Sequence, residues 1–405
     1  MTGAEVRFET VMPLGVPRGD VATSRRLKIV FLVRSLNYGG AERQLAVLAK
    51  GLHDRGHSVL VIVFYAHGPL HTELLEAGVR VRVMEKLGRW DVVRFPLQLS
   101  SVLREERPEV LHGCHGVANL MAIAMSTMVP RATIVCGIRS TSLELARYGW
   151  LTRASNVLID ALRNAPDLFI ANSRAALREV VARGYPSSKV AVIPNGIDTD
   201  RFSIDRKAGQ PIRRSLEVGD DELLIGRIGR VDPMKDYPTF LRAAAEVGKQ
   251  RAQVRFVCVG DGDAEYLSEL HALGRELGLG NRLLWMPTQR DMNAVYNALD
   301  VACSSSAFGE GFPNVVGEAM ACGVPCVVTD VGDSAWVVGE PRSVVAPRDA
   351  DALAQRLMHL VDGGRRELAR VGTESRRRII EHFATERLVL TTEAVLSATV
   401  EGAGR

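Results

Sequence analysis

Two glutamates stand eight residues apart in the segment Ser304–Thr329, which reads SSSAFGEGFPNVVGEAMACGVPCVVT. Glu310 lies between two glycines, and Glu318 falls inside a stretch that is typical of a helix beginning after a proline. A carboxylate accepts hydrogen bonds from vicinal hydroxyls of a sugar ring, and the free N–H groups of a helix start bind phosphate oxygens. Either glutamate alone could be a solvated surface residue, but the whole arrangement predicts a site for a sugar and a phosphate.

Two cations follow another predicted strand, in the segment GRIGRVDPMKD. Arg230 and Lys235 are five residues apart, so one strand end could present both to a pyrophosphate. A pair of solvated surface cations is the alternative interpretation. The Gly-x4-Gly-Lys-Ser/Thr pattern of a Walker loop is missing.

Two segments in the first half of the chain also follow predicted strands. The turn NYGGAER contains Gly39 and Gly40, which either permit a tight turn or let an acceptor approach the next helix. The segment VLHGCHGVAN contains His112 and His115. A lone histidine is more often a buried core residue than a catalytic one, but both of these fall at the expected edge of a cleft.

The composition restricts the function classes. The chain has 405 residues, of which 46% are apolar and 24% charged, and a formal net charge of +4. These values are typical of two or three globular domains and exclude a polybasic nucleic-acid binder, a disordered chain and a multi-span membrane protein. The longest uncharged stretch, Val110–Pro130, contains several polar residues, so we expect it to be buried. We expect a soluble, cytoplasmic protein.

The cysteines and the Asp-x-Asp triplets give no support for a metal. None of the six cysteines forms a Cys-x-x-Cys pair, so we expect all of them to be reduced and buried. The triplets Asp198–Asp200 and Asp261–Asp263 could hold a divalent cation on a diphosphate, but aspartate is also common in turns. We expect no metal and no other cofactor.

Short apolar strands alternate with amphipathic helices from residue 27 onward, and the pattern restarts near Leu223. Strands without alternation, separated by helices, indicate parallel sheets that are covered on both faces. The sequence therefore predicts an α/β protein of two doubly wound, Rossmann-like domains that face each other across a cleft, with ligands beyond the carboxyl ends of the strands. The expected divisions are a poorly ordered tail (1–26), a first domain (27–198), a linker (199–215), a second domain (216–380) and a C-terminal helix (381–405) that packs back across the junction.

These segments resemble the retaining nucleotide-sugar glycosyltransferases of the GT-B fold, in particular the large fourth sequence family. The resemblance covers nearly the whole chain after residue 26, and its motifs fall in the expected order. They are the turn Asn37–Arg43, the Asn-Ser segment Ala171–Ser173, the linker motif Pro194–Asp198 with Phe202, the pair Arg230 and Lys235, the turn Gly260–Gly262, the Glu-x7-Glu motif from Glu310 to Glu318, and the segment Glu318–Cys326.

The resemblance implies a role for each of these positions. Glu310 would contact the donor sugar and Glu318 the nucleotide ribose, while Arg230 and Lys235 would neutralise the departing diphosphate. The donor-binding backbone would comprise Gly311, Phe312, Pro313 and Asn314, and Gly39 and Gly40 would face the acceptor or phosphate. The family often has His-x-His where this chain has His112-Gly-Cys-His115, and we assign contact with the transferred sugar to His115.

The resemblance also implies the reaction and its partners. A sugar would pass with retention from a nucleotide-diphosphate donor to an acceptor hydroxyl, without a protein nucleophile, in polysaccharide or glycoconjugate biosynthesis. The acceptor would be a sugar or a lipid-linked sugar, bound by the first domain, and the donor would bind to the second. A nucleotide-sugar epimerase and a non-catalytic nucleotide-sugar-binding module are the alternatives. A further hypothesis is peripheral contact with the inner face of the membrane through Leu143–Arg163. The alternative interpretation of this segment is a helix that lines the cleft.

Overall fold

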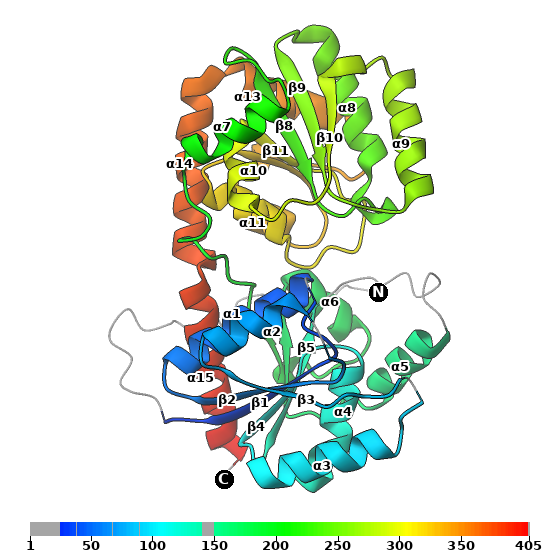
Figure 1. Cartoon of the computed structure of the whole chain (residues 1–405), viewed down its shortest axis with the longest axis vertical. Helices are drawn as coiled ribbons and strands as arrows, with labels where there is room; N and C mark the ends of the chain where they lie inside the picture. The colour runs from blue at the N-terminus through cyan, green and yellow to red at the C-terminus, as the bar shows by residue number, and fades with distance from the viewer. Residues whose placement is uncertain (1–24, 38, 67, 89, 140–149, 404–405) are drawn as a thin grey trace, which may run out of the picture.

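The computed structural model describes residues 25–37, 39–66, 68–88, 90–139 and 150–403, and the side chains of all of these except 150–154. The predicted tail lies outside this range, apart from Arg25 and Arg26. Two α/β domains lie one above the other, and a pair of consecutive helices runs along both of them (Figure 1).

The first domain is built on a sheet of seven parallel strands in the order β3-β2-β1-β4-β5-β6-β7. These strands are β1 (Lys28–Val33), β2 (Ser58–Val63), β3 (Arg80–Val83), β4 (Val110–Gly113), β5 (Thr133–Ile138), β6 (Leu168–Ala171) and β7 (Val190–Val192). One face packs on α1 (Gly40–Asp54), α2 (Pro69–Glu76) and α15 (Thr385–Ala403), and the other on α3 (Arg94–Glu106), α4 (Val117–Met125) and α6 (Arg174–Ala182). Because both faces are covered, the central strands are apolar on both sides.

The second domain repeats this arrangement with six parallel strands in the order β10-β9-β8-β11-β12-β13. They are β8 (Leu223–Ile228), β9 (Val254–Val259), β10 (Leu283–Met286), β11 (Val301–Ser304), β12 (Cys326–Thr329) and β13 (Val344–Val345). Its helices are α8 (Tyr237–Gln250), α9 (Ala264–Glu276), α10 (Met292–Ala298), α11 (Asn314–Ala321), α12 (Ser334–Val338), α13 (Ala350–Asp362) and α14 (Gly364–Phe383). The predicted pair of doubly wound domains is therefore confirmed. In each sheet the strand order reverses beside its first strand, which creates a crevice at the carboxyl ends.

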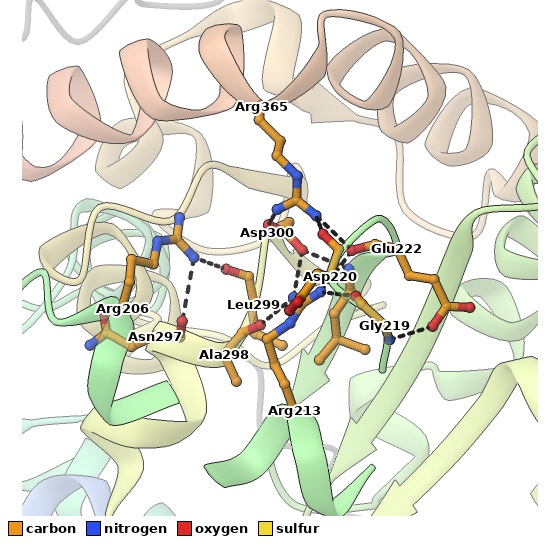
Figure 2. A network of polar contacts seen from close by, with 11 residues as sticks. Arg206, Arg213, Gly219, Asp220, Glu222, Asn297, Ala298, Leu299, Asp300 and Arg365 are labelled. Carbon is orange, nitrogen blue, oxygen red and sulfur yellow. Dashed lines mark hydrogen bonds and ion pairs between the residues drawn. The ribbon is translucent and has the colours of Figure 1, made fainter. Parts of the chain in front are cut away.

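The linker is shorter than predicted. Residues 206–215, which the sequence analysis assigned to the linker, form α7 (Arg206–Ser215), and this helix belongs to the second domain. Its Arg213 donates to one oxygen of the buried Asp300 at 2.8 Å, and Arg365 of α14 lies 3.4 Å from the other (Figure 2). Asp300 also accepts the N–H of Leu224 at 2.8 Å. This network ties α7, β8 and α14 together at the amino-terminal edge of the second sheet.

The chain crosses back to the first domain between α14 and α15. At the crossing, the N–H of Ile197, just before the linker, donates to the carbonyl of Phe383 at 2.7 Å, so the two connections between the domains run side by side. Beyond it, α15 packs closely against α1. A Cβ atom at Gly51 would lie 2.3 Å from a methyl group of Val389, so this close approach requires a glycine.

Part of the predicted interfacial segment lies outside the described residues, which resume at α5 (Trp150–Ala161). Across the portions of the chain that the structure describes, no helix is both long and apolar enough to cross a bilayer. All six cysteines are buried free thiols.

Candidate active site

Glu310 and Lys235 meet in the second domain. Glu310 lies in the loop between β11 and α11, and Lys235 ends a short 3-10 turn after β8. The Lys235 ammonium is 2.5 Å from Oε1 of Glu310, and the Ser306 hydroxyl donates to the same oxygen at 2.6 Å. Burial alone would raise the pKa of Glu310, but the Lys235 charge and these hydrogen bonds lower it below its usual value. The carboxylate is therefore ionised at neutral pH.

The loop that carries Lys235 is held by a buried arginine that the sequence analysis did not single out. The Arg227 side chain is fully buried and donates to the carbonyls of Ile228 (2.6 Å) and Lys235 (2.8 Å) and to Ser305 Oγ (3.2 Å). Its guanidinium also lies over the Tyr237 ring, 4.8 Å from the centroid. A charged residue inside the apolar strand β8 is the sequence signal that could have revealed this support.

Glu318 lies one helical turn into α11 and is also buried. Tyr296 of α10 donates its hydroxyl to Oε2 of Glu318 at 2.7 Å, and Arg43 from the first domain lies 3.5 Å from Oε1. Here burial raises the pKa of Glu318, because Tyr296, Arg43 and the more distant Arg201 compensate only part of the desolvation. The two glutamates thus share one wall of the cleft but differ in how completely their charge is balanced.

The turn before α11 places backbone beside the first domain. Gly311 lies so close to Asn172 that a Cβ atom would be 3.0 Å from Oδ1 of that residue. Pro313 occupies the N-cap position, and Asn314, the first helical residue, accepts a hydrogen bond from Asn195 at 2.9 Å. The side chain of Phe312 packs in the core instead, so only its backbone lies in the turn.

Gly39 and Gly40 face this turn from the start of α1. A Cβ atom at Gly40 would lie 3.3 Å from Nδ2 of Asn314, so a small residue here lets the two helix starts approach each other. Gly39 is the N-cap residue of α1. The structure therefore brings the glycine turn of the first domain against the segment that contains Glu310 and Glu318.

Arg230 is placed differently from Lys235. Its side chain is 66% exposed and lies 3.5 Å from Asp232. It therefore stands on the surface near the Lys235 turn, where a ligand could recruit it.

His112 and His115 lie at the end of β4. Neither ring nitrogen of His112 has a hydrogen-bond partner within the described residues, and burial lowers its pKa to about 3. The ring packs 5.2 Å from that of Phe31, so His112 is a neutral core residue. His115 lies nearer the surface; its Nδ1 is buried without a described partner, and burial lowers its pKa.

An unforeseen carboxylate joins the two domains. Asp333, just before α12, accepts the N–H groups of Arg174 (2.7 Å) and Ala175 (3.0 Å) at the start of α6. The Arg174 guanidinium lies 4.0 Å from the centroid of the Trp336 ring, also in the second domain. A carboxylate at a helix N-terminus is stabilising, and here it acts across the domain junction.

A cavity of about 500 Å³ opens between the domains next to this junction. It is lined by α6 of the first domain and by the loops after β11 and β12, including Phe308, Gly309 and Gly332. Gly332 has a φ of +63°, and a Cβ there would lie 2.3 Å from the carbonyl oxygen of Glu310. The backbone of Glu310 therefore lies against Gly332, a residue that lines this cavity.

The Asp-x-Asp triplets lie in turns. Asp198 accepts backbone N–H groups of Asp200 and Arg201, and Asp263 caps the start of α9. Within the described ranges, no group of three or more histidine, cysteine or acidic side chains is arranged to hold a metal ion.

The fold, together with two family-model matches, supports a glycosyltransferase of the GT-B fold. A family model for glycosyl transferases group 1 matches residues 222–363 in the second domain, and a model for glycosyltransferase family 4 matches residues 38–201 in the first.

Curated relatives carry related names. The chain is 24% identical over 312 residues to the putative glycosyltransferase EpsF of Bacillus subtilis, a match that covers 76% of this chain and 80% of EpsF. It is 31% identical over 258 residues to D-inositol 3-phosphate glycosyltransferase 2 of Catenulispora acidiphila, covering 60% of this chain and 58% of that protein. The chain thus spans little more than half of the second relative.

Solved structures share the fold over nearly the whole chain. Anabaena HepE in complex with UDP and glucose superposes with a TM-score of 0.79 at 23% identity, covering 92% of this chain and all of HepE. The sucrose-phosphate synthase of Thermosynechococcus elongatus superposes with a TM-score of 0.74 at 19% identity, covering 91% and 98% of the two chains.

Proposed function

We propose that this glycosyltransferase moves a hexosyl group, with retention, from a nucleotide-diphosphate sugar to an acceptor hydroxyl. The observation that supports this most strongly is the pair of buried carboxylates on one wall of the cleft, Glu310 and Glu318, with Lys235 against the first. Two buried acceptors of hydrogen bonds suit two hydroxylated rings, and the cation suits the phosphates between them.

In the proposed reaction, the bond between the anomeric carbon and the diphosphate breaks while the acceptor oxygen forms a new bond on the same face. The acceptor proton passes to the departing phosphate oxygen, so the step needs no protein nucleophile. Lys235 and Arg230 would stabilise the charge that develops on the diphosphate, and Glu310 would orient the sugar. His115 would contact the transferred sugar from the first domain. We propose that no metal takes part.

The acceptor would bind to the first domain and would be a sugar or a lipid-linked sugar in polysaccharide or glycoconjugate assembly. In support, the glycosyltransferase family 4 model matches residues 38–201, which span this domain. We propose a cytoplasmic location, with peripheral contact with the inner face of the membrane where the acceptor carries a lipid.

Calorimetric titration with nucleoside diphosphates tests the assignment of the donor site. Glu318→Ala removes the carboxylate that would accept hydrogen bonds from the ribose, so we expect the nucleotide affinity to fall severalfold or more. Arg230→Ala leaves binding largely intact but slows transfer, because its exposed cation acts on developing charge. Glu276→Ala, an exposed position at the end of α9, is the control. Unchanged nucleotide affinity in Glu318→Ala would refute this assignment.

Product analysis with the donor alone separates transfer from the alternatives. An epimerase would convert the donor without an acceptor, and a binding module would not convert it at all. Slow hydrolysis of the donor, followed by faster transfer when acceptors are added, is the result expected for a glycosyltransferase.

A further inference from the structure

Arg139 is a cation on the first domain that the proposed function does not use. It directly follows β5, at the carboxyl end of the strand, and its side chain is partly buried. One guanidinium nitrogen donates a long hydrogen bond of 3.4 Å to Oδ1 of Asn195, and the backbone carbonyl accepts from Nδ2 of Asn172, also at 3.4 Å. Both contacts of Arg139 lie within the first domain, and Asn195 in turn donates to Asn314 of the second domain.

No carboxylate within the described part of the chain balances this charge. Burial lowers the pKa of Arg139, and the Cys114 thiol is the one nearby group that opposes the shift. The buried Arg213, by contrast, is paired with Asp300 at 2.8 Å. Removing a cation from water without a carboxylate partner is unfavourable, so we expect the burial of Arg139 to lower the stability of the fold.

The neighbours of Arg139 are also incompletely satisfied. Oδ1 of Asn172 and Nδ1 of His115 are both buried without a hydrogen-bond partner among the described residues, and Asn172 is only 4% exposed. Asn172 follows β6 and His115 follows β4, the two strands that flank β5. Three adjacent strand ends therefore present a cation without a carboxylate partner, and an amide oxygen and an imidazole nitrogen without a hydrogen-bond partner, as far as the described residues go.

This cluster is connected to the donor wall but stands on the opposite side of the cleft. Asn195 receives the Arg139 contact and donates to Asn314 at the start of α11, while Asn172 faces Gly311. The cations assigned to the donor diphosphate, Arg230 and Lys235, belong to the second domain. An anion bound by Arg139 would therefore approach from the side of the first domain.

We propose that Arg139 binds an anionic group, a phosphate or a carboxylate, carried by the acceptor. A hydroxyl of the same molecule would donate to Oδ1 of Asn172. This proposal rests on the proposed function, because the first domain is there assigned to the acceptor. It restricts the acceptor to acidic sugars, sugar phosphates or phosphate-linked glycans, and it makes Arg139 a determinant of acceptor specificity.

The test titrates inorganic phosphate into the full-length protein after the donor site has been saturated with the nucleoside diphosphate that binds best among UDP, GDP and ADP. Glucuronate, titrated in parallel, represents the carboxylate. We expect phosphate or glucuronate to bind the wild type, and Arg139→Gln to weaken that binding at least tenfold, with Arg139→Lys in between. Arg131→Gln, an exposed arginine just before the same strand, is the matched control and should bind as the wild type does.

The thermal unfolding temperature is a second readout. It should change in opposite directions for a ligand-binding Arg139 and for a purely structural Arg139. Without ligand, Arg139→Gln should unfold at the same temperature as the wild type or higher, because an unbalanced charge is removed. A structural arginine would lower that temperature.

Several results would overturn the proposal. The first is that each anion binds to wild type and Arg139→Gln with the same affinity, and the second is that neither anion binds to the wild type. The third is that Arg139→Gln weakens binding of the nucleoside diphosphate but not of the anion, which would assign Arg139 to the donor diphosphate. If no nucleoside diphosphate binds, the proposed function fails, and the same anion titrations on the unliganded protein still decide the role of Arg139.

Discussion

The two walls of the cleft differ in how their polar groups are satisfied. On the second domain, Glu310 is matched by Lys235 and Ser306, and Glu318 by Tyr296. On the first domain, Asn172 Oδ1 and His115 Nδ1 lack partners among the described residues, and Arg139 lacks a carboxylate there.

This difference separates preorganisation from recognition. A wall whose charges are already held in place can stabilise developing charge without rearranging, which is the electrostatic requirement of catalysis. A wall with unmatched groups gains most when a ligand of complementary chemistry arrives, which is a source of specificity. We therefore expect changes on the second domain to affect rate, and changes on the first to affect which acceptor is used.

The largest effect on the transfer rate should come from Glu310→Gln, on the second-domain wall. The amide cannot balance the Lys235 ammonium, and the sugar loses its charged acceptor, so we expect transfer to slow by about 100-fold or more. Steady-state kinetics with a saturating donor measures this, with Glu276→Gln at an exposed site as the control. A rate within about threefold of the wild type would contradict the role given to Glu310.

His112, in the core of the first domain, allows an unmatched polar group to be tested through the pH dependence of stability. Its pKa is about 3 in the folded protein against an ordinary value of 6.5, so below pH 6.5 the unfolded chain takes up a proton that the native state refuses. Stability is therefore lost as the pH falls from about 6.5 towards 3, by about 1.4 kcal/mol per pH unit from this group. In His112→Leu this contribution disappears.

Urea unfolding of both proteins at pH 7, 6, 5 and 4 measures the difference. The free energies of unfolding should diverge with falling pH, with the variant losing less stability. Parallel curves would show that His112 is protonated in the native state.

Asp333→Asn tests the link between the walls. The amide keeps the shape of the cap but accepts hydrogen bonds from the start of α6 more weakly and without charge. We expect the free energy of unfolding to fall by about 1 kcal/mol and the domains to separate more readily. Urea unfolding measures the first and small-angle scattering the second. Asp349→Asn, at the start of α13, is the matched control, since it weakens a cap that accepts from Ala352 within one domain.

Tyr296→Phe should have the smallest effect. It removes the hydroxyl that donates to Glu318, so we expect a loss of about 1 kcal/mol in stability and a further rise in the pKa of that carboxyl. Nucleotide affinity should fall less than in Glu318→Ala, because the carboxyl group itself remains. Calorimetric titration of both variants with the same nucleotide compares them; equal losses would mean that the hydroxyl itself contacts the ligand.

The sequence predicted the elements whose apolar pattern is simple. Strand β8 begins at Leu223, where the apolar pattern was expected to restart. Helix α7 was missed because Gly209 and Pro211 are typical of a linker, although Gly209 is required by the backbone of Asn297, which a Cβ would meet at 2.4 Å.

The sequence predicted the site residues that stand together in one short motif. It did not predict those whose contacts depend on packing between segments far apart in the chain. Glu310, Glu318 and Lys235 stand in recognisable motifs, and the structure places them on one wall. The contacts of Asp333 with α6 and of Arg43 with Glu318 join residues far apart in the sequence, so spacing gives no sign of them. Arg139 left one signal, a charged residue at the end of an apolar strand, which parallel strand ends commonly use for ligands.

The position of α15 also affects how the chain can fold while it is being synthesised. Leu388, Val389, Val395 and Leu396 complete the hydrophobic core beneath α1, yet the entire second domain is translated before them. During synthesis, that side of the first sheet therefore stays incompletely covered until α15 emerges. A chain that ended between α14 and α15 would then contain a complete second domain and still leave a hydrophobic surface of the first domain open.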